Sequence, residues 1–574
     1  MKVAAMFVHR SRPGAVSFRQ QRGAALMIMM LIMVLGTSWA VISAVTQASR
    51  NTVNEQIKTG ESLRLAKNAL LGYLAQQALT SDVPGMFPCP EALTGIGTPS
   101  SEGKANSGCT TLPVIGRLPW KTLGIDKPLD GAGEALWYVV GTGVRAAPIN
   151  FSTTGALTLD GTANAAVALI IAPGVALNTV SNSGTAPSPC AKRDQITGRN
   201  VSPLNSSDFV ECGNATLAAF VSSRNDTWGN DRVISITAAE MLSAIEGAVA
   251  DRIQRTVAPA LNGGSSTPTT DWYQSKSSSE WGINFFPFAS TWSDPTTNGS
   301  CGSYGVTEGL LPLASGEVTS GTGCSARWTS ASVSSVSAGF TPGSCTANAT
   351  IMTCTFTYTG STVVSVLATA ANIAMGFRTR PTKNDITFTA SVISVTSPTT
   401  AIVAASGDGQ LAFQATTNGA SGTGTISIPH PADSFLLKTT GTGASTANPN
   451  LFWFITNQWQ RYTYYAISPA VSANPSGVCT SANVTDCLTL TNAEAGTGNT
   501  NDKRLVLILS GRPLAGKSQP TANLNDYFEL QNDQTTAPGD RTFQRDRIST
   551  TFNDRPAVCP FQRQTTGTAN VICN

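Results

Sequence analysis

The chain has 574 residues, only 12% of them charged, and its formal net charge at pH 7 is +3. This length leaves room for several domains, and so neutral a charge balance provides no basic surface for nucleic acid. Glycine and proline are frequent but not periodic, which excludes collagen, and the many Ser, Thr, Asn and Ala residues are typical of a loop-rich, extracytoplasmic β protein.

The first predicted element is an apolar segment, residues 24–45, that contains no charged residue. As a helix it would be long enough to cross a bilayer core of ~30 Å. The leader before it, residues 1–23, carries basic residues and no acidic ones, a bias that keeps a leader in the cytoplasm. The sequence therefore predicts a single-pass inner-membrane protein with a periplasmic head, which could reach the cell surface after assembly.

Arg22 and Gly23 stand directly before this apolar segment, so cleavage after Gly23 would produce a mature chain that starts at Ala24. This arrangement resembles the class III leader of type IV pilins and type II secretion pseudopilins. The resemblance implies that a prepilin peptidase cuts at this junction and that the apolar helix then packs against other pilins or pseudopilins in a filament. The helix residues that we expect to make those contacts are Leu26, Ile28, Leu31, Val34 and Trp39.

One residue departs from the pattern of the major pilins. The fifth mature residue, usually Glu in that family, is Ile28 here. The chain is therefore more similar to PilX-type minor pilins and K-type pseudopilins, and its large head favours a place at the filament tip or in assembly initiation. The main alternative is an uncleaved single-span membrane-anchored adhesin or binding protein. A more distant one is an exported hydrolase that works through carboxylates.

The apolar helix is predicted to continue beyond the membrane segment, over residues 24–79. Leu63, Ala66, Leu70 and Leu74 recur at helical spacing, and Pro84-Gly85 ends the pattern. At 1.5 Å per residue such a helix would be about 84 Å long. Its second half would pack against the head.

The head is predicted to be α+β and built from two duplicated modules of a helix and an antiparallel sheet. The first module covers residues 80–236, and the second covers residues 237–316 and 451–574. A capping box, Thr237 to Glu240, opens the second module's helix, which we expect to end near Val257. Six segments then recur in the same order, at residues 86–88 and 285–288, 116–119 and 309–312, 136–140 and 462–467, 166–173 and 505–513, 208–211 and 526–529, and 229–232 and 552–555.

Residues 317–450 interrupt the second module with short alternating runs between Gly-rich turns. Cys354, Phe356 and Tyr358, for example, fall on one face. This pattern predicts an inserted β-sandwich, with a short helix at residues 366–375 as the competing interpretation of one segment. The insertion could bind a surface ligand or be a structural decoration, and Asp408 could contact calcium.

The cysteine pattern predicts disulfides in an exported protein, because an even number of cysteines follows the apolar segment and none forms a CxxC pair. Pairing between sequence neighbours is the simplest connectivity, and no metal site is expected. The cysteines are Cys89, Cys109, Cys190, Cys212, Cys301, Cys324, Cys345, Cys354, Cys479, Cys487, Cys559 and Cys573.

No catalytic site is expected, and no cofactor. A Ser/His/Asp triad needs a histidine, and the only one outside the leader is His430, between two prolines. The acids of segments 208–211 and 526–529 recur in both modules, so we interpret them as residues that fix a shared turn. Asp231-Arg232 and Asp554-Arg555 are interpreted as salt bridges at strand ends. The sequence thus predicts a non-enzymatic pilin-like protein.

Overall fold

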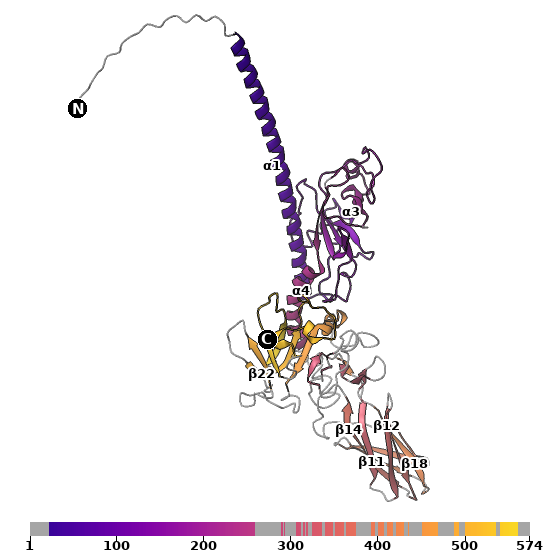
Figure 1. The fold of residues 1–574 in the computed structure, drawn as a ribbon. Helices are drawn as coiled ribbons and strands as arrows, with labels where there is room; N and C mark the ends of the chain where they lie inside the picture. Colours follow the sequence, from indigo (N-terminus) through magenta and orange to yellow (C-terminus); the bar gives the residue numbers. More distant parts are fainter. Residues whose placement is uncertain are drawn as a thin grey trace, which may run out of the picture.

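The structure is a computed structural model of a mixed α+β protein with several sheets and few helices (Figure 1). It describes residues 22–258 except 218 and 225, then 289–290, 292, 306–311, most of 314–435, 451–468, 487–492, 500–534 and 540–560. The side chains of residues 22–26, 44 and 46–51 lie outside this description.

The longest element is α1 (Arg22–Ala78), a single helix without a proline. Its two halves have different surroundings. The side chains of Leu63, Ala66, Leu70, Leu74 and Ala78 are buried, and their spacing of three and four residues places them on one face. The apolar half nearer the N-terminus projects away from the rest of the molecule and is exposed (Figure 1). The periodicity therefore predicted both the length of α1 and the face that packs.

The expected membrane span is not supported. In the described part of the chain, no helix has the apolar length needed to cross a membrane. The prediction of a single-pass inner-membrane location, with residues 24–45 as the transmembrane segment, is therefore wrong.

The first sheet lies beside the buried half of α1. Its four antiparallel strands are β1 (Val114–Arg117), β2 (Trp137–Val140), β5 (Ala168–Ala172) and β6 (Arg232–Ile236), in the order β1-β2-β5-β6. All residues of β2 and β5 are buried, as the continuous apolar runs predicted for a central strand. A hairpin, β3 (Leu157–Leu159) with β4 (Thr162–Ala166), covers the other face.

The second sheet contains the same arrangement. Strands β7 (Glu308–Leu310), β20 (Thr463–Ile467), β22 (Thr500–Leu509) and β24 (Arg555–Pro560) pair antiparallel in the order β7-β20-β22-β24. Strands β21 (Leu488–Asn492) and β23 (Thr542–Arg545) extend this sheet beyond the common four. The second sheet is therefore the first with a two-stranded addition.

The two sheets also share a close backbone approach at one glycine. Gly116 in β1 lies opposite Tyr138, and Gly309 in β7 lies opposite Tyr465. A Cβ atom on Gly116 would lie 2.3 Å from the Glu91 carbonyl oxygen, and one on Gly309 would lie 2.1 Å from that of Ser290. Both glycines are therefore required for the same reason, because a side chain there would collide with a neighbouring backbone.

Helix α4 (Ala238–Arg252) follows β6 directly and packs against both α1 and β24. Thr237 caps it, and the Glu240 side chain completes the predicted capping box. Lys67 of α1 donates to Glu240 over 2.6 Å, and Arg252 donates to the carbonyl of Ser81 after the end of α1. These two contacts make α1 and α4 parallel neighbours. A π-helical turn, Ile253–Val257, continues α4 to the predicted end.

The insertion folds as two four-stranded antiparallel sheets that pack face to face. One contains β11 (Arg327–Ser335), β14 (Val363–Ala374), β17 (Gln410–Thr416) and β16 (Thr400–Ser406), and the other β12 (Phe340–Ala347), β13 (Ile351–Tyr358), β18 (Gly422–Pro429) and β15 (Val392–Val395). Cys354, Phe356 and Tyr358 are buried between the sheets, as their alternation predicted. The competing helix is absent, because residues 366–374 belong to β14.

A buried asparagine joins the two halves of the head. Asn457, just after α7 (Phe452–Thr456), accepts a hydrogen bond from the Ile149 backbone N–H over 3.0 Å and donates to the Asp82 carbonyl over 2.8 Å. Asn150 donates to the Asn457 carbonyl over 2.7 Å. The ring of Phe151 packs edge-on against Trp459 beside this contact. The two sheets therefore share one continuous core.

The remaining described elements are short. They are α2 (Gln195–Gly198), α3 (Cys212–Thr216), β8 (Ala314–Ser315), β9 (Glu317–Val318), β10 (Cys324–Ser325), β19 (Ser434–Phe435) and the 3-10 turns Leu93–Gly95, Ser206–Asp208, Trp459–Tyr462, Leu524–Asp526 and Leu530–Asn532.

Three disulfides are described, Cys89–Cys109, Cys190–Cys212 and Cys345–Cys354. Each joins sequence neighbours, as adjacency predicts. Cys487 is also disulfide-bonded, and the pairing of Cys301, Cys324, Cys479, Cys559 and Cys573 lies outside the described side chains. Such bonds fit a secreted or periplasmic protein.

Packing of α1 can be tested with two leucines on the same helix. Leu70 is fully buried and Leu65 is half exposed. We expect Leu70→Ala to lower the free energy of unfolding of the head by about 2–5 kcal/mol, because it leaves a cavity in the core. Leu65→Ala should change it by about 0.5 kcal/mol or less. Chemical denaturation measures both, and equal effects would contradict this assignment of faces.

Candidate functional site

The predicted filament-contact residues lie on the exposed half of α1. Ile28, Leu31, Val34 and Trp39 are 58%, 62%, 62% and 73% exposed, and the large apolar residues between them are exposed to a similar degree. These residues point in all directions around the helix, because they include the consecutive residues 27–35. This segment is therefore apolar on every side, and its side chains are exposed with respect to the part of the chain that the structure describes.

The predicted cleavage junction lies at the start of the same helix. Because α1 begins at Arg22, Gly23 and Ala24 are in its first turn. The side chains of these residues and of Leu26 lie outside the description.

A group of buried polar residues, which we name the first carboxyl centre, comprises Glu211, Asp231, Asn214 and Asn230. Asp231 is almost completely buried at the start of β6, and its Oδ2 accepts hydrogen bonds from the Glu211 backbone N–H and the Asn214 Nδ2, each over 2.9 Å. Glu211 Oε2 in turn accepts from the Asn230 N–H over 3.0 Å. The centre thus joins the turn before α3 to the beginning of β6.

The second carboxyl centre comprises Glu529, Asp554, Asn532 and Asn553, and it has the same connections. Asp554 Oδ2 accepts from the Glu529 N–H over 2.9 Å and from Asn532 Nδ2 over 3.0 Å. Glu529 Oε2 accepts from the Asn553 N–H over 3.1 Å. Here the turn before Leu530–Asn532 is joined to the beginning of β24.

Asn214 and Asn532 each bond both backbone groups of one further residue. Asn214 accepts from the Val221 N–H and donates to its carbonyl, and Asn532 makes the same two bonds with Gln544. The second asparagine of each pair reaches the chain that leaves the central strand, where Asn230 donates to the Val175 carbonyl and Asn553 to that of Arg512. The four residues of one centre therefore make the same hydrogen bonds as the four of the other, both among themselves and to these backbone partners.

The acids of both centres have altered pKa values. Burial raises the pKa of Asp231 and Asp554 well above the ordinary value, and the neighbouring glutamate charge raises each further. Burial also raises the pKa of Glu211 and Glu529, although hydrogen bonds to their carboxylates act in the opposite direction. Desolvation is the main cause in all four cases.

Sequence reasoning found part of this arrangement. It identified the recurring acids of the two modules and assigned them to a shared turn, where Glu211 and Glu529 do lie. The interpretation of Asp231-Arg232 as a strand-end salt bridge was wrong, because Asp231 binds the Glu211 turn instead and Arg555 pairs with Glu246 of α4 over 3.0 Å. The spacing Glu-x-x-Asn, found at Glu211 and again at Glu529, is the sequence signal that it missed.

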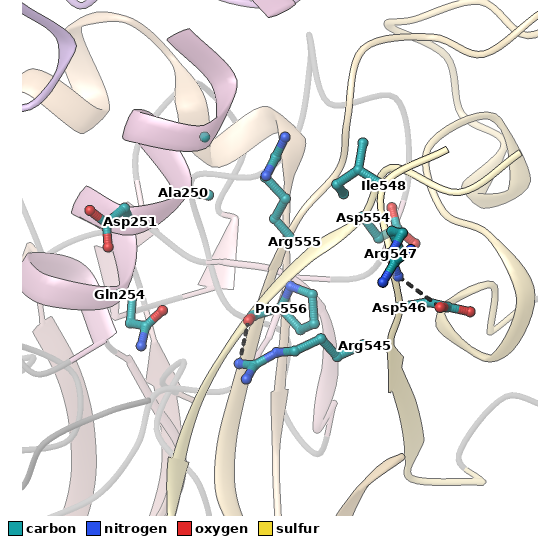
Figure 2. Close-up of a pocket in the computed structure, with 11 residues that line it drawn as sticks. Ala250, Asp251, Gln254, Arg545, Asp546, Arg547, Ile548, Asp554, Arg555 and Pro556 are labelled. Atoms are coloured by element: carbon teal, nitrogen blue, oxygen red, sulfur yellow. Dashed lines mark hydrogen bonds between the residues drawn. The ribbon is translucent and has the colours of Figure 1, made fainter. Parts of the chain in front are cut away.

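A cleft of about 590 Å³ lies between α4 and the start of β24 (Figure 2). Its charged residues already have partners within the chain, since Arg545 donates to the Pro556 carbonyl and Arg555 pairs with Glu246. Its lining residues are Gly247, Ala250, Asp251, Gln254, Arg545, Asp546, Arg547, Ile548, Asp554, Arg555 and Pro556. The cleft contains no histidine, cysteine or serine that could act as a nucleophile or its base.

The described residues include no group of three or more His, Cys, Asp and Glu arranged to hold a metal ion. His430 and Asp408, which the sequence singled out, lie outside the described residues. The two carboxyl centres are buried and have the same arrangement in both modules. This favours a structural role, in which each centre fixes a turn to a strand, over contact with a substrate.

The sequence matches no family model and no curated protein, and the structure matches no solved structure.

Asn214 and Asn532 should contribute equally to the stability of the head. We expect Asn214→Ala and Asn532→Ala each to lower the free energy of unfolding by about 1–3 kcal/mol, because each leaves a buried carboxyl oxygen and a backbone pair without their partners. Asn200→Ala, at an exposed asparagine that bonds only within α2, is the matched control. Denaturation that gives a large loss for one centre and none for the other would contradict their equivalence.

Proposed function

We propose that this chain is a non-enzymatic, pilin-like or pseudopilin-like filament subunit whose α1 packs against the helices of sister subunits. The observation that carries the proposal is the exposed half of α1, whose consecutive large apolar side chains at residues 27–35 are exposed around the whole circumference of the helix. A helix of this kind is stable only when other surfaces surround it. A bundle of parallel helices from neighbouring subunits supplies such surroundings on all sides.

The basic leader and the Gly23-Ala24 junction support the same function. Cleavage by a prepilin peptidase would remove the leader and leave the apolar helix at the new N-terminus. The disulfides support assembly in an oxidising compartment. The resemblance to PilX-type minor pilins and K-type pseudopilins favours a minor subunit, because Ile28 replaces the usual glutamate.

The position of the head favours the filament tip. The second sheet and the inserted sandwich lie beyond the C-terminal end of α1, whereas the first sheet lies beside the helix (Figure 1). In a shaft of staggered parallel helices, the next subunit would need the space that these domains occupy. At the tip the sandwich would face outward and would be the part of the chain available to a surface ligand.

The head itself is proposed to derive from an internal duplication. The common strand order, the matched glycines and the two carboxyl centres support this origin. Under this proposal α4 is the counterpart of the packed half of α1, and the second copy has no counterpart of the exposed half. One filament helix would then serve two head modules.

Leader processing can be tested with Gly23→Ala. We expect the wild-type protein from sheared filaments to begin at Ala24, and the variant to retain residues 1–23 and to be missing from the filaments. Intact-mass measurement and N-terminal sequencing distinguish the two forms. A chain that keeps its leader in the wild type, with no effect of the substitution, would rule out this pathway.

Helix packing can be tested with Leu31→Lys. We expect this variant to fold with an unchanged melting temperature, since the Leu31 side chain is exposed, and to be lost from filaments because it buries a charge among apolar helices. Leu65→Lys, at an exposed leucine near the head, is the control and should be incorporated. Quantitative immunoblotting of sheared filaments gives the ratio, and equal incorporation of both variants would refute the proposed contact.

The tip position can be tested by electron microscopy with a gold label on the sandwich. We expect one cluster of gold at a filament end. Gold spaced along the shaft would exclude the tip and leave the assembly function intact.

A further inference from the structure

We infer that each carboxyl centre holds one proton between its two acids, and that the head therefore contains two matched, pH-sensitive latches that weaken as the pH rises. The inference rests on the hydrogen bonds of the two centres and is independent of the proposed filament function.

The first argument is a count of donors. Asp231 Oδ2 accepts two N–H groups, and both oxygens of Glu211 accept N–H groups, from Gln195 and Asn230. Asp231 Oδ1 is buried and has no donor among the described residues. In the second centre, Asp554 Oδ1 is buried without a donor in the same way. A buried carboxyl oxygen without a donor is less costly when the group is protonated than when it is an ionised carboxylate.

The second argument is the contact between the two acids. Asp231 accepts the Glu211 N–H, and Glu211 accepts the N–H of Asn230, the residue before Asp231, so the two carboxyl groups are held beside each other; Asp554 and Glu529 are held in the same way. Two buried carboxylates in such a position would repel each other, which favours protonation of one acid. The aspartate is the protonated member, because its Oδ2 is satisfied by two donors and its Oδ1 remains to donate. The glutamate then accepts as the carboxylate.

The charges around each centre agree with this assignment. Both hydrogen bonds to each aspartate come from neutral donors, a backbone N–H and an asparagine amide. Arg199, which is ion-paired to Glu134, acts on Glu211 through its charge, and Lys517 acts on Glu529 in the same way. Asp554 also lines the cleft that contains Arg545, Asp546, Arg547 and Arg555, where Arg545 donates to the Pro556 carbonyl and Arg555 pairs with Glu246.

The direction of the pH effect follows from the raised pKa values of the aspartates. In the unfolded chain these aspartates ionise near pH ~4, whereas in the folded chain they keep the proton to a higher pH. The stabilisation is therefore complete below the unfolded pKa and is lost as the pH rises through the folded pKa. Above that pH, two negative charges would be in contact in a buried site.

Each carboxyl centre fixes the beginning of the last strand along the chain in its sheet. Asp231 stands directly before β6, which continues into α4, and Asp554 stands directly before β24, which packs on α4. Loss of the proton should release these strand beginnings before the central strands of either sheet.

The test uses the purified full chain and the double variant Asp231→Asn with Asp554→Asn. An asparagine amide copies the protonated aspartate, because it donates to the glutamate but cannot ionise. We expect the melting temperature of the wild type to fall by about 5 °C more than that of the variant between about pH 5 and pH 9. Asp251→Asn, at a half-exposed acid on α4, is the control and should retain the wild-type decline.

Infrared spectroscopy supplies a second measurement that does not depend on the variant's folding. We expect the wild type at neutral pH to show the carbonyl band of a protonated carboxylic acid, with single variants Asp231→Asn and Asp554→Asn each losing about half of it. Absence of that band from the folded wild type would overturn the inference. Equal pH dependence of the melting temperature in the wild type and in a folded double variant would do the same.

Discussion

The packing of one face of α1 is the constraint on which the head depends. Five buried side chains between Leu63 and Ala78 contact the first sheet and α4, so the helix that projects from the molecule is also part of its core. Each buried leucine contributes about 1.5–3 kcal/mol to the stability of the head. The packed face therefore holds the whole helix in place, and the projecting half needs no contact with the head. The projecting half can therefore expose a fully apolar surface while the head remains folded.

The periodic features of the fold could be predicted from the sequence. Helical spacing in α1, the apolar runs of β5 and β22 and the alternation in β13 each reflect side chains that must be buried, and burial leaves a pattern in the sequence. The capping box of α4 is instead a local signal, because its two residues bond the free N–H groups at the helix start. The duplication could be predicted as well, because the recurring segments follow one another in the same order in both halves of the head. Strand β14 was ambiguous, since its alanine-rich segment fits a helix as well as a strand.

The polar interior could be predicted only in part, for a physical reason. The partners of Asp231, and the contacts of Asn457 across the head, join residues far apart in the sequence, and a single polar residue has no period that would reveal its burial. The sequence favoured the nearby Arg232 as the partner of Asp231, yet the Glu211 turn provides the donors that a buried carboxyl group needs. The apolar stretch of α1 was recognised in the sequence, but the membrane location assigned to it was wrong.

The connection between β6 and α4 determines how a mechanical load would travel through this molecule. Only Thr237 separates the two elements, and α4 then runs parallel to α1, held to it near both ends by Lys67 and Arg252. A pull on the sandwich would therefore pass through the second sheet into two helices placed side by side, which resist it in shear, rather than into a flexible tether. The head would therefore act as a rigid body at the end of α1. A force applied to the sandwich would reach the helix with little change in the orientation of the head relative to α1.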